Sequence, residues 1–231
     1  MKISKREFET IKFTLKEIYS EFHPIGVQSV YLWGSVLSDE YLSNESDIDS
    51  IAIVKDNTLP KYEEEIRSRI KQLASKIKDF NINLLYLGEL NGSKIHSRLA
   101  GNIHPKLLLL DFEGWKKVSG KKFLRVEFKI KEISFDEAIK ISLEKINKVY
   151  FCKTGNPPDK YLIKSVIKIC HYLNEKEKGR HLFTHRNLIK NCPKERKNII
   201  QTLLLIKESN WSNESIERNL SEIKRFLNEL R

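Results

Sequence analysis

The chain has 231 residues, enough for one large domain or two small ones, since domains usually contain roughly 100 to 200 residues. Hydrophobic residues make up 40% and charged residues 32% of the chain, a composition that excludes a disordered tail, a collagen-like protein and a membrane bundle. The formal net charge is +11, and residues 126–231 hold most of the excess, with 22 basic and 14 acidic side chains against 20 and 17 in residues 1–125.

The N-terminal segment predicts an amphipathic helix. Ser4 and Glu7 form a capping box, and apolar residues recur at helical spacing through residues 8–22. The segment shows no apolar leader, and the longest aliphatic run, residues 107–110, is far shorter than the roughly 20 residues that a membrane span needs. We therefore expect a cytoplasmic protein that has no membrane contact.

Strand and helix patterns then alternate through the first half of the chain, with period-two or fully apolar runs for strands and period-3.6 runs for helices. The expected elements are, in order, a strand at 29–33, a strand buried on both faces at 48–54, a helix at 62–77 and a strand at 82–87. Further apolar runs at 106–111 and 115–118 could complete the sheet. The pattern predicts a small mixed sheet flanked by helices.

The second half shows only helical patterns, expected at residues 134–149, 159–173, 194–208 and 213–230. The fold class is therefore α+β, with an N-terminal domain over residues 1–125 and a basic, all-α domain over residues 126–231. One face of the second of these helices carries Lys160, Lys164 and Lys168 at helical spacing. These lysines either contact an acceptor or polyanion, or form the solvated side of the helix.

The stretch that indicates chemistry is Gly34-Ser35, eleven residues, then Asp47 and Asp49. Two residues apart at the start of a strand, both carboxylates project from the same face, about 7 Å apart at Cα. Such a pair is repulsive without a cation, and Mg²⁺ is commonly held by one or two carboxylates plus substrate phosphates. Gly34 allows a phosphate to approach the backbone, and Ser35 adds a hydroxyl donor. Together they predict a nucleoside triphosphate site beside a metal. The alternative, without a binding function, is a glycine turn followed by a solvated acidic loop.

The order helix, strand, Gly34-Ser35, aspartate strand, helix, strand resembles the DNA polymerase β-type nucleotidyltransferase superfamily, especially its minimal nucleotidyltransferases and aminoglycoside adenylyltransferases. The resemblance covers about residues 5–122 and extends weakly to the helical tail. It implies Mg²⁺-dependent transfer of a nucleoside monophosphate, AMP from ATP being our choice, to an acceptor hydroxyl, with loss of pyrophosphate. It also implies that Gly34 and Ser35 hold the triphosphate and that Asp47 and Asp49 ligate the metal.

One position departs from the family pattern, which has a third acidic residue on the strand after the second helix. The matching residue here is Asn83, whose neutral carbonyl can touch a cation but takes no proton. Three accounts stay open. Asp79 or Glu89 substitutes for the missing acid, the enzyme works with two carboxylates plus the nucleotide, or the fold is a degenerate binding module.

The leading hypothesis is an enzyme whose acceptor is a small molecule, an RNA end or a protein hydroxyl. The positive charge of residues 126–231 modestly disfavours cationic aminoglycosides as the acceptor. The alternative is a catalytically degenerate nucleotidyltransferase fold that binds nucleic acid or a protein partner through its basic helical domain. What separates the two is whether a carboxylate of Asp79, Glu89 or Asp111 reaches Asp47 and Asp49.

Two weaker signals concern aromatic and imidazole side chains. His181 and His185 are four residues apart, a spacing that suits a metal on a helix, but no third ligand stands nearby in the sequence, so we expect a surface or capping role. Tyr31 and Trp33 adjoin the glycine-serine pair and could stack on a base, although core packing is the simpler expectation for both.

Overall fold

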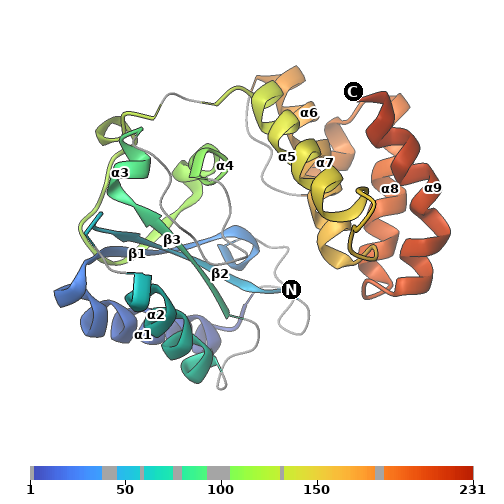
Figure 1. The fold of residues 1–231 in the computed structure, drawn as a ribbon. Coiled ribbons are helices and arrows are strands. Elements are labelled where there is room, and N and C mark those ends of the chain that lie inside the picture. The colour runs from blue at the N-terminus through green and yellow to red at the C-terminus, as the bar shows by residue number, and fades with distance from the viewer. Residues whose placement is uncertain are drawn as a thin grey trace. The chain divides into compact units, whose positions relative to one another are not determined.

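The structure is a computed structural model that describes residues 3–37, 46–57, 60–74, 80–92, 105–130, 133–179 and 185–230. The chain forms two compact units, Met1–Glu132 and Ile133–Arg231 (Figure 1). The described strands all belong to the first unit, and the described part of the second unit contains helices joined by turns. This arrangement confirms the α+β class with a helical C-terminal region.

The first unit is built on a four-stranded sheet with the order β3-β2-β1-β4. Its strands are β1 (Val27–Trp33), β2 (Ile48–Val54), β3 (Phe80–Tyr86) and β4 (Lys116–Gly120). β2 and β3 run parallel, whereas β1 is antiparallel to both β2 and β4. The sheet is therefore small and mixed, as the sequence predicts, and the strand expected near residues 115–118 is its edge strand β4.

Two helices cover one face of this sheet, α1 (Lys5–Phe22) and α2 (Pro60–Ala74), as Figure 1 shows. Helix α1 begins where predicted, because the Ser4 hydroxyl accepts a hydrogen bond from the backbone N–H of Glu7 at 3.1 Å. Its apolar stripe, Ile11, Leu15 and Ile18, is fully buried against the sheet. Each such side chain stabilises the unit by roughly 1.5–3 kcal/mol, so packing holds α1 more firmly than its cap does.

The opposite face of the sheet packs against a second apolar cluster that includes α3 (Leu87–Leu90) and α4 (Pro105–Leu110). Helix α4 corrects the prediction of an extended run at residues 106–111. Pro105 occupies the first helical position, where its missing N–H is harmless, and leucine is a strong helix former. One turn of helix suffices to bury Leu108 and Leu109 in the cluster. A short apolar run therefore did not mean a strand.

The second unit contains the helices α5 (Phe135–Tyr150), α6 (Lys160–Lys178), α7 (His185–Asn191), α8 (Lys194–Glu208) and α9 (Asn213–Glu229). Ser134 caps α5, since its side chain accepts a hydrogen bond from Glu137 N–H, and Asp159 caps α6, since its side chain accepts from two backbone N–H groups. Among the helices that the structure describes, none has the length and apolar character needed to cross a membrane.

Candidate functional site

The fold brings the two halves of the predicted motif to one end of the sheet. β1 and β2 are antiparallel neighbours, and their register pairs Trp33 with Asp49. Gly34 and Ser35 follow β1 directly and begin a short 3₁₀ helix, while Asp47 directly precedes β2. The eleven residues between Ser35 and Asp47 therefore separate the motif in sequence but not in space.

Gly34 and Asp49 lie against each other. Gly34 has a backbone φ of +79°, a conformation that residues other than glycine rarely adopt. A β-carbon at Gly34 would lie 3.2 Å from Asp49 Oδ2, closer than ordinary van der Waals contact. The absence of a side chain at Gly34 thus leaves the space beside Oδ2 of Asp49 without a β-carbon, on a side from which a cation could approach.

Asp47 and Asp49 share a face of the sheet. Ile48 between them is fully buried in the cluster under α1 and α2, so the two flanking side chains project toward the other face, as the alternation of strand residues requires. Both aspartates are half-buried, and Oδ1 of Asp47 is a buried atom. Carboxylates withdrawn from water are costly unless a cation or hydrogen bonds compensate.

The parallel pairing of β2 with β3 determines which residue lies beside this carboxylate pair. Asn81 pairs with Asp49, whereas Asn83 pairs with Ile51, two residues farther along the strand. Asn81 is exposed, and Asn83 is only 5% exposed. Sequence reasoning did not single out Asn81, because the apolar pattern placed the strand start at residue 82 rather than at Phe80.

The other acids considered for the third position can now be placed. Glu89 is buried at the far end of β3, where its Oε2 accepts a hydrogen bond from Tyr86 N–H at 3.0 Å. Asp111 precedes a short 3₁₀ helix after α4, and Asp79 lies outside the described residues. Within the described part of the chain, no three His, Cys, Asp or Glu side chains gather as a metal site.

Asp47 and Asp49 nevertheless fit a magnesium ion that is shared with a substrate. Mg²⁺ prefers oxygen ligands and is usually bound by one or two carboxylates together with phosphate oxygens and water, rather than by an all-protein cage. Two aspartates beside an accessible glycine backbone match that donor set. A structural zinc site, by contrast, would need four nitrogen or sulfur ligands.

The aromatic and histidine side chains that the sequence singled out can also be placed. Tyr31 is buried, and its hydroxyl accepts from Phe123 N–H at 3.0 Å, so it is a core residue. Trp33 is half-buried against the same apolar cluster. His181 lies outside the described residues, while His185 Nδ1 is 3.2 Å from Nε2 of His171. Burial, followed by nearby cations, lowers the pKa of His185 to about 3, so this imidazole is neutral near pH 7.

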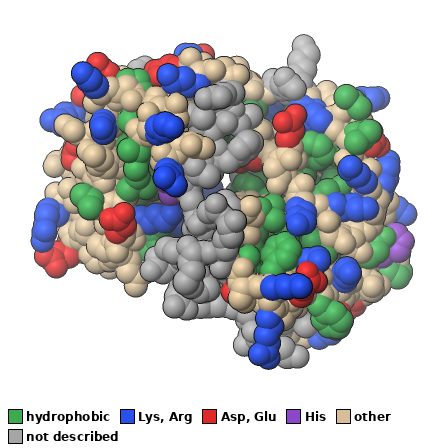
Figure 2. Space-filling model, turned by 180° about the vertical axis from the view of Figure 1, so that it is seen from behind, with side chains coloured by type: hydrophobic (Ala, Val, Ile, Leu, Met, Phe, Trp, Pro, Cys, Tyr) green, Lys and Arg blue, Asp and Glu red, His purple; other side chains and the backbone are tan. Residues whose placement is uncertain are grey.

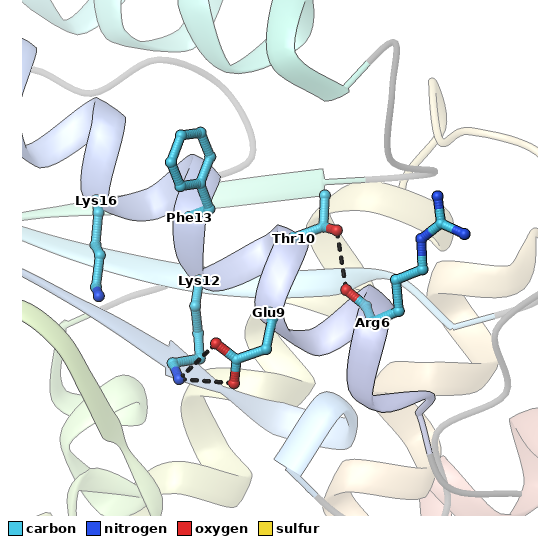
Figure 3. A pocket seen from close by; sticks show the side chains of 6 residues that line it. All are labelled: Arg6, Glu9, Thr10, Lys12, Phe13 and Lys16. Carbon is cyan, nitrogen blue, oxygen red and sulfur yellow. Dashed lines mark hydrogen bonds and ion pairs between the residues drawn. The ribbon is translucent and has the colours of Figure 1, made fainter.

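A shallow hollow of about 470 Å³ lies elsewhere, on the outer side of α1 (Figure 3). It is lined by Arg6, Glu9, Thr10, Lys12, Phe13 and Lys16. Since α1 packs on the face of the sheet opposite to Asp49, this hollow is not part of the candidate site.

Two comparisons with known proteins find matches to this chain. Residues 14–103 match the family model described as the nucleotidyltransferase domain, a range that contains the motif of Gly34, Ser35, Asp47 and Asp49. The fold is similar to that of a spectinomycin adenyltransferase from Enterococcus faecialis, solved with ATP and spectinomycin. The TM-score is 0.63 at 14% identity, over 96% of this chain and 99% of that chain. No match is found among the curated proteins.

These two matches support the resemblance to the nucleotidyltransferase superfamily: residues 14–103 match its domain model, and the fold is similar to that of an adenyltransferase. The family match supports nucleotidyl transfer as the general class of reaction. The structural match, at this low identity, concerns the fold alone.

Proposed function

We propose that this protein is a Mg²⁺-dependent nucleotidyltransferase that moves a nucleoside monophosphate, AMP from ATP, to a hydroxyl group of an acceptor. The observation that carries the proposal is the convergence of Asp47 and Asp49 with Gly34 and Ser35 at one end of the sheet. ATP is the preferred donor because the spectinomycin adenyltransferase of the same fold was solved with it. Such a reaction is expected in the cytoplasm, where nucleoside triphosphates are abundant.

Each residue of the site has a distinct role in this proposal. Asp47 and Asp49 hold the metal, which when bound neutralises triphosphate charge and fixes the geometry for in-line attack. Gly34 allows the phosphates to approach the backbone, and the Ser35 hydroxyl donates to a phosphate oxygen. Asn81, directly beside Asp49, is placed to orient the incoming acceptor hydroxyl through its amide oxygen.

In the reaction, the acceptor oxygen forms a bond to the α-phosphorus while the bond from that phosphorus to pyrophosphate breaks, and the hydroxyl proton passes to solvent water. Amide side chains such as Asn81 and Asn83 take up no proton at neutral pH. The acceptor is a small molecule, an RNA end or a protein hydroxyl. The spectinomycin bound by the structural neighbour does not decide between them for this chain.

A second candidate function is a binding module that holds nucleotide or another partner without turnover. One observation favours it: in the described part of the chain the two aspartates are not joined by a third acidic side chain, and the neighbouring positions on β3 are Asn81 and Asn83. General base catalysis typically contributes 10²- to 10⁴-fold to rate, so its absence would slow transfer greatly.

The test is thermal unfolding of the full chain with ATP, GTP, CTP or UTP, each with and without Mg²⁺. A ligand at 100 times its dissociation constant stabilises the folded state by about 2.7 kcal/mol. We expect a Mg²⁺-dependent stabilisation, largest with ATP, that is lost in Asp47→Asn/Asp49→Asn. The matched control is Glu64→Gln/Glu65→Gln, which removes the same charge from two exposed positions of α2 and should leave the effect intact.

Release of pyrophosphate, measured in the presence of candidate acceptors, separates the two functions. Stabilisation with release supports the transferase. Stabilisation without release, for every class of acceptor, supports the binding module. If no nucleotide stabilises the wild-type protein, the transferase proposal is wrong and so is a binding module that holds nucleotide at this site.

A further inference from the structure

A second chemically distinctive surface lies wholly within the helical unit. Along α6, three lysines recur every fourth residue, which places them about 6 Å apart along the helix axis. Each ammonium lies over an aromatic ring: Lys160 is 5.3 Å from the ring centre of Tyr161, and Lys168 is 5.2 Å from that of Tyr172. Such cation–π contacts hold flexible lysines in defined positions.

Lys164 lies between two rings. Its ammonium is 5.7 Å from the ring centre of Tyr161 and 5.8 Å from that of Trp211, which comes from the turn between α8 and α9. Tyr161 is 51% exposed and Trp211 is half-buried. The surface therefore offers a cation flanked by two aromatic faces that solvent can reach. We call Tyr161, Lys164, Lys168, Lys207 and Trp211 the basic-aromatic surface.

The turn that presents Trp211 is unusual. Asn210 and Trp211 both have left-handed backbone conformations, with φ of 56° and 59°. This conformation is rare for a bulky side chain and persists only where surrounding contacts enforce it. The backbone N–H of Trp211 donates to Ile206 C=O at 3.1 Å, which closes the end of α8. The backbone thus fixes the direction in which the Trp211 side chain leaves the turn.

The electrostatic environment beside this surface is positive. After burial, the groups that lower the pKa of His185 are Lys207, His171 and Lys168, in that order. Lys207 and Lys168 therefore act as positive charges on the side of the surface near His185. Lys164, Lys168 and Lys207 are each half-buried rather than fully solvated. A partly desolvated cation is stabilised by an anionic ligand.

We propose that the basic-aromatic surface binds a single-stranded nucleic acid, with phosphates on the lysines and bases stacked on Tyr161 and Trp211. Single strands are bound in this way, by a basic track interleaved with aromatic platforms, whereas an acidic peptide would use the charges and leave the rings unused. The inference concerns binding and does not depend on transferase activity.

Lys and Arg side chains occur over both units on the face shown in Figure 2, with acidic side chains among them. General positive charge therefore does not single out this surface; the arrangement of lysines against rings does. The chain offers a matched comparison, since the hollow on α1 also combines lysines with an exposed ring, that of Phe13, which is 62% exposed (Figure 3).

The experiment measures binding of a fluorescein-labelled 20-nucleotide RNA, and of DNA of the same sequence, to the full chain by anisotropy across a range of KCl concentrations. Each phosphate contact in a single strand contributes about −0.7 to the slope of log K against log salt. We expect a slope near −2 for the wild type, and a slope reduced by about 1.4 in Lys164→Gln/Lys168→Gln. Trp211→Ala should weaken binding roughly tenfold with little change in slope.

Two further variants guard against misfolding and general charge effects. Lys164→Arg/Lys168→Arg keeps both charges and should restore the wild-type slope. Phe13→Ala/Lys16→Gln alters the α1 hollow and should bind as the wild type does. The proposal is overturned if no oligonucleotide binds, if the α1 variant loses as much affinity as the α6 variant, or if ATP or poly-glutamate displaces the RNA as effectively as unlabelled RNA does.

Discussion

The carboxylate of Asp49 lies against the backbone of Gly34, with Oδ2 only 3.2 Å from the place where a β-carbon would stand. The two residues belong to neighbouring antiparallel strands, and the pairing of Trp33 with Asp49 holds them together. A residue that is expected to bind metal and a residue that is expected to bind phosphate therefore share one small space. A substitution at one of these residues should therefore alter what binds at the other.

Gly34→Ala tests this relationship. The substitution forces alanine into a left-handed conformation, which costs about 1–2 kcal/mol, and it displaces the Asp49 carboxylate. We expect lower stability and the loss of nucleotide-dependent stabilisation. Gly92→Ala is the control, because Gly92 has a similar φ of +85° but nothing within 4 Å of its added β-carbon. Urea unfolding with and without ATP and Mg²⁺ compares them; equal nucleotide responses in the two variants would count against the shared site.

Asn81→Asp places a third carboxylate beside Asp49. We expect the metal-free protein to become slightly less stable through charge repulsion, and Mg²⁺ alone to stabilise it more than it stabilises the wild type. Asn83→Asp should behave differently. This position is 5% exposed, so an added charge destabilises the fold, by several kcal/mol if it stays ionised, with no gain in Mg²⁺ response. Calorimetric Mg²⁺ titration distinguishes them, and a larger gain at Asn83 would show that the register argument is wrong.

The stability of the helical unit should depend on pH through His185. Burial, with Lys207, His171 and Lys168, lowers the folded-state pKa of His185 to about 3, whereas an unfolded histidine titrates near 6.5. Below pH 6.5 the unfolded chain therefore binds one more proton than the folded chain. We expect the free energy of unfolding to fall by about 1.4 kcal/mol per pH unit from this group as pH drops from about 6 toward 3.

His185→Gln removes the titrating group, so its free energy of unfolding should vary less steeply with pH over the same range. Urea unfolding between pH 4.5 and 7.5 measures the difference in slope between variant and wild type. Parallel pH profiles would mean that the pKa of His185 is the same in the folded and unfolded states, which would contradict the prediction.

Asp159 forms hydrogen bonds with both the first turn of α6 and the last residue of α5. Its Oδ1 accepts from the backbone N–H groups of Tyr161 and Leu162, at 2.8 and 3.1 Å, and from the Tyr150 hydroxyl at 2.7 Å. Asp159→Ala should destabilise the protein by about 1–2 kcal/mol. Asp159→Asn retains a capping oxygen, so its loss of stability should be much smaller. Thermal unfolding checks both; equal losses would contradict a capping role.

The same substitution has a spectroscopic consequence. Burial raises the pKa of Tyr150, and its hydrogen bond to Asp159 raises it further. In Asp159→Ala we expect the pKa of Tyr150 to fall toward the ordinary tyrosine value. Ultraviolet titration of tyrosinate absorbance, compared between Asp159→Ala and the wild type, detects the change.

Local patterns were sufficient for most of the elements. The capping box at Ser4 predicted where α1 begins, because a cap and the first turn lie within four residues of one another. The apolar run at residues 106–111 was interpreted as part of the sheet, but it forms helix α4. A short run without periodicity is compatible with a buried helical turn as well as with a strand.

What the sequence by itself determined was which side chains are candidates for the site: two carboxylates, a glycine and a serine, all within the range that matches the nucleotidyltransferase domain. Only the tertiary structure decided their partners. The pairing of Asp49 with Trp33 and with Asn81, rather than Asn83, depends on the register between strands up to about thirty residues apart. Register is set by how whole strands bury their apolar faces, and a shift of one residue would turn each side chain to the opposite face. No local pattern contains that information.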